Sequence, residues 1–466
     1  MNMIGLTTLF VARLKKYVYK SSLRQKFASG VLWTTGTKVW LVLLNLAFNM
    51  LLVRVLSPND VGNFFLIVSI WNILGTLTIF GLPKTTVKFI AETNALNSNQ
   101  TAGVATRILG FTGLNSAIGG LLFVGIKDWL AEQVFHFPYL KDVLGLLLIW
   151  IFFTNLQRVI AEVFRGLQDF HWANVFGTQQ VATRTLFVGM VFITWLTAYH
   201  ASLSQVILWF AIANGITFLA AVGIFFYRFR GWTVGHIPFR WGDLIALAWP
   251  LWVSSLGFLA RKQADVLILG MFRPANEVAL YGIAVRLTQF ASTPLLVVNG
   301  VLPPFIVDLY TSGRKRQLEH LLRMASSGFL LFAFGICIVL VFFAPLLLTQ
   351  LFGTYYAQAY APLVVLLAGM VVNVSTGACV WVLNMTGHEK VNMIVSLTAG
   401  VVQVLLMYIL AEKLGVFGVS LVVTSVLILQ MVFISIYAWR VVGIRTWPYL
   451  PAQVWHSLTR LSKSQG

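Results

Sequence analysis

The chain has 466 residues, of which 58% are hydrophobic and 10% are charged, and its mean hydropathy is +0.83. Soluble domains carry about 25% charged residues, so this composition excludes a soluble globular protein and indicates a polytopic membrane protein. The formal net charge is +19. Because Lys and Arg mark cytoplasmic loops and favour anionic headgroups, we expect membrane lipids, and no nucleic acid, among the partners.

Apolar runs of about 20 residues recur along the whole chain, and each is long enough to cross the hydrocarbon core as a helix. We predict twelve spans, at about 28–53, 60–82, 105–126, 142–161, 173–197, 204–227, 244–272, 277–302, 323–346, 359–384, 391–411 and 415–439. The predicted fold is an all-α membrane protein of two six-helix lobes around a central cavity. Its parts are a basic segment at 1–27, a lobe at 28–230, a linker at 231–243, a second lobe at 244–440 and a tail at 441–466.

The distribution of basic residues predicts the orientation of these spans. With the N-terminus inside, 23 of the 33 Lys and Arg fall in inside segments, 5 fall in outside segments and the rest lie within spans. Inside segments of membrane proteins are enriched in Lys and Arg, so both termini are predicted to be cytoplasmic. Segment 308–323 alternates basic and apolar residues. It is predicted to be either an interfacial helix that binds headgroups or a solvated link.

A weak internal repeat relates the two halves. Residues 54–64 follow span one, and residues 272–281 follow span seven; Pro58 matches Pro274, and Val61 matches Val278 after a one-residue insertion. The Pro58–Pro274 match is an offset of 216 residues, and at this offset Arg261 and Asp265 correspond to Asn45 and Asn49 of span one. After the insertion the offset is 217, and Gln289 corresponds to Asn72. Parallel repeats of this kind occur in transporter folds.

Polar residues inside the spans form stripes that we expect to line a cavity. A charge near the bilayer centre costs about 2.5–3.5 kcal/mol on insertion scales, so each such residue calls for a reason. The stripes of spans one and seven are the strongest, since their members recur at helical spacing. The candidate binding residues are Lys38, Asn45, Asn49, Asn72, Arg184, Arg261, Arg286 and Gln289.

The sign of the charges predicts the kind of substrate. Five Lys or Arg and one acidic residue, Asp265, lie within the spans, so the interior is net cationic. Such a cavity favours an anion, and Arg suits phosphate because it donates two parallel hydrogen bonds. A polyprenyl diphosphate headgroup with sugars attached would match these cations and amides. Asp265 is a candidate gate for Arg261, or a carrier of a proton or Na⁺ for coupling.

Structural alternatives remain open for several of these residues. Arg261 and Asp265, spaced i, i+4, could be only a structural pair. Lys262 lies on a different helix face and could reach toward the outer interface. Arg184 could bond backbone carbonyls, and Asn45 and Asn49 could hold helices together.

Signatures of catalysis are missing from the sequence. It contains no P-loop, no His-Glu-x-x-His zinc motif and no paired carboxylates near one span end. We therefore expect no enzyme activity, no metal site and no cofactor.

Several short motifs, in order and spacing, resemble the Wzx-type lipid-linked oligosaccharide flippases of the multidrug/oligosaccharidyl-lipid/polysaccharide exporter (MATE/MOP) superfamily. They are residues 54–64, Phe80 to Glu92, Phe164 to Phe170, Ala264 to Gly270, Leu351 to Ala357 and Asn384 to His388. The resemblance covers about residues 25–440. It implies two six-helix lobes that enclose a cationic cavity and work by alternating access. The family offers no single invariant motif, so no residue role is transferred from it.

The resemblance also implies a function and a location. We expect a flippase that moves an undecaprenyl-diphosphate-linked oligosaccharide from the inner to the outer leaflet of the bacterial cytoplasmic membrane, for cell-surface polysaccharide assembly. Other polysaccharide assembly proteins would then be partners. One alternative is a cation-coupled exporter of small organic molecules. A second is a non-transporting membrane scaffold of a glycan assembly complex.

Overall fold

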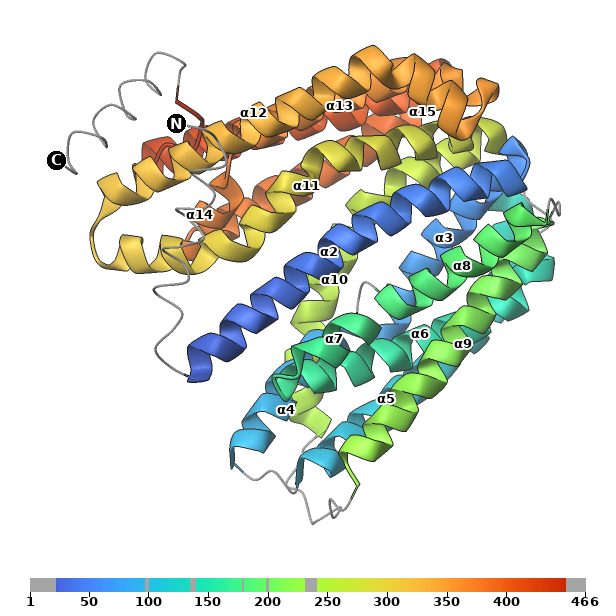
Figure 1. The fold of residues 1–466 in the computed structure, drawn as a ribbon, viewed down its shortest axis with the longest axis horizontal. Helices are drawn as coiled ribbons and strands as arrows, with labels where there is room; N and C mark the ends of the chain where they lie inside the picture. The colour runs from blue at the N-terminus through green and yellow to red at the C-terminus, as the bar shows by residue number, and fades with distance from the viewer. Residues whose placement is uncertain are drawn as a thin grey trace.

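The computed structural model describes residues 22–96, 100–134, 140–177, 180–197, 201–230 and 241–449. The described chain is built from helices (Figure 1), with no strand among these residues. The N-terminal elements are α2 (Ser22–Val55), α3 (Pro58–Ile79), α4 (Leu82–Leu96), α5 (Thr101–Trp129), η2 (Leu130–Val134), α6 (Leu140–Gly166), α7 (Phe170–Phe176), α8 (Val181–Leu196) and α9 (Leu203–Arg228). The C-terminal elements are α10 (Trp241–Phe272), α11 (Ala275–Thr311), α12 (Lys315–Leu347), η3 (Leu348–Phe352), η4 (Thr354–Ala359), α13 (Tyr360–Ser375), α14 (Cys379–Met385), α15 (Glu389–Tyr437) and η5 (Ala438–Val442).

The predicted twelve-span, two-lobe layout is confirmed. By length and composition, seven helical segments in the described part of the chain are suited to cross a membrane. One of them, α15 with η5, is broken at Gly415 and holds two spans; φ is 55° there, in the left-handed region that favours glycine. Helices α2, α8, α10 and α11 complete the set. A multi-pass membrane protein follows.

The two predicted repeat segments form matching helix corners. Pro58 opens α3 behind the N-cap Ser57, whose hydroxyl accepts a hydrogen bond from the Asp60 amide at 3.2 Å. Pro274 is the N-cap of α11, and Arg273 pairs with Glu277 across the corner at 3.9 Å. Proline suits both positions because its fixed φ is compatible with a helix start and it has no N–H to leave unpaired. We call the end of the molecule that holds both corners the corner end.

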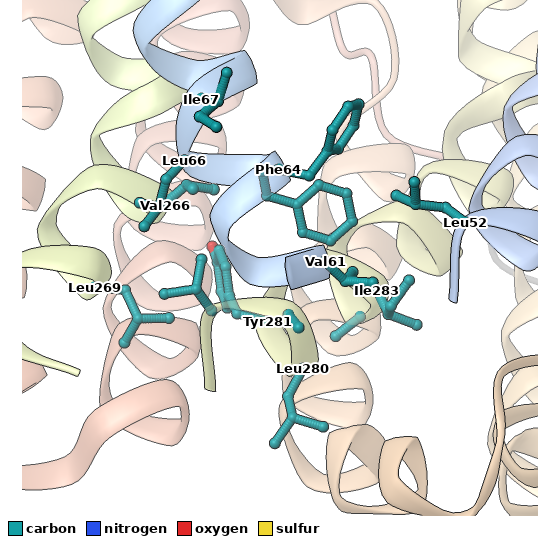
Figure 2. Close-up of a cluster of buried hydrophobic side chains, with 14 of the residues drawn as sticks. Leu52, Val61, Phe64, Leu66, Ile67, Val266, Leu269, Leu280, Tyr281 and Ile283 are labelled. Atoms are coloured by element: carbon teal, nitrogen blue, oxygen red, sulfur yellow. The ribbon is translucent and has the colours of Figure 1, made fainter. Parts of the chain in front are cut away.

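Close packing of α3 on α10 and α11 joins the lobes at the corner end. Glycines make this approach feasible, because a Cβ on Gly62 would overlap the carbonyl oxygen of Ala275. In the same way, a Cβ on Gly270 would overlap Leu66, and one on Gly282 would overlap Phe65. Figure 2 shows the surrounding apolar side chains, where Val61, Phe64 and Leu66 of α3 meet Leu269 of α10 and Ile283 of α11.

The hydrophobic core divides away from the corner end. One buried cluster includes residues of both lobes, among them Leu52, Phe65 and Ile283. A second cluster consists of residues of the N-terminal half together with Leu244 of α10. A third cluster consists of residues of α11, α12, α14 and the C-terminal part of the chain. In Figure 1 the helices of the two lobes lie together at the right of the view and separate from one another toward the left. The lobes are therefore one packed body at the corner end and two separate bodies at the other.

Two predicted segments differ in the structure. Span two was expected to run through 82 into a soluble stretch; instead α3 ends at Ile79, and a new helix, α4, fills most of that stretch. Phe80 and Gly81 break the helix because both have left-handed φ values, 49° and 70°. Segment 308–323 is no separate interfacial helix, because α12 already begins at Lys315 and continues into span nine.

The chain after α15 lies against α12. The Nε–H of Arg323 donates to the Trp447 carbonyl at 3.3 Å, and the Tyr449 amide donates to the Ser327 hydroxyl at 3.0 Å. The guanidinium of Arg323 also lies 3.9 Å from the Tyr449 ring centroid. These contacts fasten residues 443–449 to the C-terminal lobe.

The glycine contact at the corner end generates a prediction about stability. Gly62→Ala should destabilise the protein by about 1–3 kcal/mol, because the added methyl group forces α3 away from α11. The measurement is thermal unfolding of the purified protein in detergent. Gly189→Ala is the control: nothing lies within 4 Å of a Cβ there, so a slight rise in melting temperature is expected. Equal melting temperatures for the two variants would contradict the packing.

Candidate functional site

Four basic side chains lie where the shared core gives way to the separate cores of the two lobes. They are Arg158 of α6, Arg184 of α8, Lys262 of α10 and Arg286 of α11, and we call them the cation cluster. The charges of Arg158 and Arg184 act on each other, as do those of Arg184 and Arg286. Lys262 is within electrostatic range of both Arg184 and Arg286. The cluster therefore spans both lobes, since Arg158 and Arg184 belong to the first half and Lys262 and Arg286 to the second.

Neutral groups, rather than carboxylates, hold the three arginines. Arg184 Nη1 donates to Asn45 Oδ1 of α2 at 2.7 Å. The guanidinium of Arg158 lies 5.3 Å from the centroid of the Trp71 ring of α3, which stacks on Trp150 at 4.5 Å. Such cation–π contacts favour the charge without neutralising it.

Arg286 makes the corresponding contact across the lobe interface. Its guanidinium lies 5.1 Å from the ring centroid of Phe65, a buried residue of α3. The same ring packs on Gly282, one turn before Arg286 on α11. Helix α3 therefore supplies aromatic faces to arginines of both lobes.

Asp265 is the carboxylate of this region, and a tyrosine holds it. The Tyr281 hydroxyl, on a fully buried residue of α11, donates to Asp265 Oδ2 at 2.8 Å. Asp265 Oδ1 accepts from the Val266 amide at 2.8 Å. No basic side chain that the structure describes lies within 4 Å of its oxygens, although the charge of Arg286 acts on it from further away. Asp265 therefore offsets only part of the cluster's charge.

The structure brings together some of the predicted site residues. Asn45, Arg184, Asp265 and Arg286 lie in or beside the cation cluster. Asn49 is buried one turn beyond Asn45; its amide N–H donates to the Asn45 carbonyl, and its Oδ1 has no partner among the described atoms. That unsatisfied acceptor is consistent with a site for a polar ligand.

Other predicted residues have different surroundings. Asn72 donates to the Val68 carbonyl of its own helix at 2.8 Å, so one of its two amide N–H donors is used within the helix. Gln289 lies on α11 three residues beyond Arg286, with an exposed side chain. The side chains of Lys38 and Arg261 lie outside the described residues, although their backbones belong to α2 and α10. Their part in the site stays a prediction.

Sequence reasoning missed two members of the cluster. Arg158 was counted among the inside basic residues although position 158 falls within predicted span four at 142–161, and it lies within α6, eight residues before the helix ends. A polar stripe could have revealed it, since Thr154 and Asn155 precede it at helical spacing. Lys262 was left off the candidate list because it could equally reach toward the outer interface; in the structure its charge acts with those of Arg184 and Arg286.

The cluster is arranged to receive a negative charge. The four cations repel one another and one carboxylate offsets only part of their charge, so the electrostatic free energy of the cluster is unfavourable until an anion binds. Arginine side chains fixed by aromatic and amide contacts keep further N–H donors for a ligand. The geometry therefore suits an anionic group such as phosphate, bound between the lobes.

Comparison with solved structures places the fold among transporters of the MOP superfamily. An inward-facing multidrug resistance MATE family transporter of that superfamily aligns with a TM-score of 0.69 at 16% identity, covering 86% of this chain and 97% of its own. The lipid II flippase MurJ, in an inward closed conformation, aligns with a TM-score of 0.65 at 13% identity, covering 88% and 87%. An outward-facing MATE family transporter aligns less well, with a TM-score of 0.59 at 16% identity, covering 88% and 94%.

A family model specifies the protein further. The model described as "Polysaccharide biosynthesis protein" matches residues 27–310, which is more than half of the chain. The chain therefore belongs to the polysaccharide biosynthesis protein family, within the fold of the MOP transporters. No curated protein sequence matches it closely enough to count as a relative. The predicted resemblance is confirmed at the level of family and fold.

The repulsion within the cluster generates a second prediction. Arg184→Gln removes a charge next to Arg158 and Arg286 but keeps an amide that can donate to Asn45. We expect its melting temperature to equal or exceed that of the wild type, because the lost repulsion offsets the altered hydrogen bond. The readout is thermal unfolding at low ionic strength in detergent. A melting temperature several degrees lower would show that the Arg184 charge is a structural contact.

Proposed function

We propose that this membrane protein moves a lipid-linked oligosaccharide with a diphosphate group between the leaflets of the bacterial cytoplasmic membrane. The observation that carries the proposal is that the charges of Arg184 in the first lobe and Arg286 in the second act on each other across the lobe interface, while neither guanidinium forms an ion pair with a carboxylate that the structure describes. A diphosphate placed there would contact both lobes at once. Undecaprenyl diphosphate, with a glycan attached, is the carrier that we propose.

Translocation would follow from the divided core. With the corner end outside, as the distribution of basic residues predicts, the described conformation is closed outside, and the lobes separate toward the cytoplasm. The headgroup would enter from the cytoplasmic side and meet the cation cluster. Breaking the contacts of α3 with α10 and α11 would then expose it outside, while the polyprenyl chain stays in the bilayer. This sequence of states is alternating access.

Residues beside the cluster would contact the sugars and bind the coupling ion. Asn45, Asn49, Asn72 and Gln289 would contact the glycan or the diphosphate, with Lys38 and Arg261 adding charge. Asp265, bonded to Tyr281 beside Arg286, is the proposed site of gating or of proton or Na⁺ coupling.

A cation-coupled exporter of small organic molecules is the competing function, because similar structures include multidrug transporters. The charge of the cluster opposes it, since organic cations would be repelled by four basic side chains. Binding assays can separate the two. Purified protein should bind farnesyl diphosphate, a short soluble polyprenyl diphosphate, and not tetraphenylphosphonium; the opposite preference would favour the exporter.

Complementation of a bacterial strain that lacks its polysaccharide flippase tests the function directly. Arg158→Gln, Arg184→Gln and Arg286→Gln should each lower surface polysaccharide at least tenfold at equal membrane levels, because each removes a partly buried charged donor from the diphosphate. Lys38→Ala and Arg261→Ala test the two residues whose side chains are not described. The control is Arg316→Gln, an exposed arginine in the first turn of α12, with normal export expected. Normal export from all five site variants would refute the cationic site and leave a scaffold role.

A further inference from the structure

A groove lies between α5 and α10, and none of its lining residues belongs to the cation cluster. Its volume is about 530 Å³, and its lining residues are Arg107, Gly110, Phe111, Leu114, Trp241 and Ile245. Small-molecule sites have volumes of roughly 300–1,000 Å³, so the groove can hold a hydrocarbon chain. The α5 residues are spaced i, i+3, i+4 and i+7, so they form one stripe along the helix.

The walls of the groove are apolar, and it adjoins the lipid-facing side of α5. Leu114 is 60% exposed and, further along the helix, Leu121 is 73% exposed and Leu122 is 70% exposed. In a span predicted to cross the bilayer, such exposed leucines face hydrocarbon. Across the groove, Trp241 and Ile245 are also partly open, at 45% and 42%. A lipid chain therefore has direct access to the groove.

A charge marks one end of this apolar stripe. Arg107 is exposed near the start of α5 and makes no hydrogen bond or ion pair with any residue that the structure describes. Trp241 begins α10 on the other wall, and tryptophan favours the headgroup level of a membrane. An unpaired cation at headgroup level beside a hydrocarbon-sized groove complements an anionic lipid.

The groove adjoins the contact that holds α10 on the first lobe. The rings of Phe111 and Trp241 meet at 5.6 Å, and Phe111 also meets Phe80 at 6.5 Å. Phe80, at the break between α3 and α4, packs on Trp249 and Trp252 of α10 at 6.1 and 5.1 Å. An occupant that touches Phe111 and Trp241 therefore adds contacts to the joint between α10 and the N-terminal lobe.

We propose that this groove is a binding site for one anionic phospholipid of the membrane. An acyl chain lies along the stripe of α5 against Trp241 and Ile245, and the headgroup phosphate pairs with Arg107. The bound lipid stabilises α10 against the N-terminal lobe. This site is separate from the transport site and does not depend on which substrate is carried.

Native mass spectrometry of the delipidated protein, titrated with phosphatidylglycerol or phosphatidylcholine of matched chains, tests the site. One phosphatidylglycerol should bind more tightly than the others and more tightly than any phosphatidylcholine. Arg107→Gln should weaken that first binding about fivefold, toward the level of phosphatidylcholine, since a basic residue at the membrane surface contributes about that factor. It alters no packing, so it reports on the site even if another variant folds poorly.

Gly110→Leu fills the groove itself. A Cβ there meets nothing within 4 Å, so the larger side chain can enter the groove without displacing the fold. It should lower the affinity for phosphatidylglycerol at least tenfold and remove the rise in melting temperature that this lipid gives the wild type. Gly125→Leu, in equally open space on the same helix, is the matched control and should behave like the wild type.

Three results would overturn the proposal. The first is equal affinity of the wild type for the two lipids, and the second is unchanged phosphatidylglycerol binding in both Arg107→Gln and Gly110→Leu. The third is a clear preference of this groove for undecaprenyl phosphate over phosphatidylglycerol, since it would assign the groove to a polyprenyl chain.

Discussion

The approach of α3 to α10 and α11 is the constraint on which the rest of the structure depends. Contacts at Gly62, Gly270 and Gly282 with the backbone and side chains of the opposite lobe bring the helices closer than added side chains would allow. Because these contacts occupy only one end of the bundle, each lobe completes its own core at the other end. The result is a helical bundle whose lobes are joined at one end and have separate cores at the other.

The electrostatics follow from the same geometry. The cation cluster lies where the shared core ends, so its charges are near one another, with the three arginines partly buried and Lys262 exposed. A protein interior stabilises such charges poorly unless partners are provided. Here the partners are the rings of Trp71 and Phe65 and the amide of Asn45. That arrangement keeps the arginines oriented while their charge remains available, as anion recognition requires.

The sequence was a good guide to the fold and a partial guide to the site. Spans are legible because a bilayer imposes length and apolarity on every crossing segment, and the proline corners made the repeat visible. The end of span two near residue 82 was predicted, but helix α4 was not, because Lys84 and Lys88 beyond the break at Phe80–Gly81 indicated a soluble stretch. Only tertiary packing against α10 shows why the helix stops there.

The site residues were harder to predict from the sequence, because their partners lie on other helices. Arg184 and Arg286 stood out as charges in apolar spans, and the structure places them within range of each other. Arg158 was missed because it lies near the end of its span, and the count of basic residues by membrane side assigned it to an inside segment. The aromatic partners could not be predicted, since Trp71 and Phe65 look like ordinary core residues until the partner helix is known.

The position of α10 has a consequence for how the chain is made. Its first half packs on α4 and on the aromatic residues around Phe80, whereas its second half packs on α15 and α3. The ribosome completes α10 long before α15 exists, and domains generally assemble in the order of their synthesis. The opening turns of α10 can therefore dock on a finished N-terminal lobe while the later half waits. The contacts of the first half of α10 therefore connect the second lobe to the first before the other helices of the second lobe have been made.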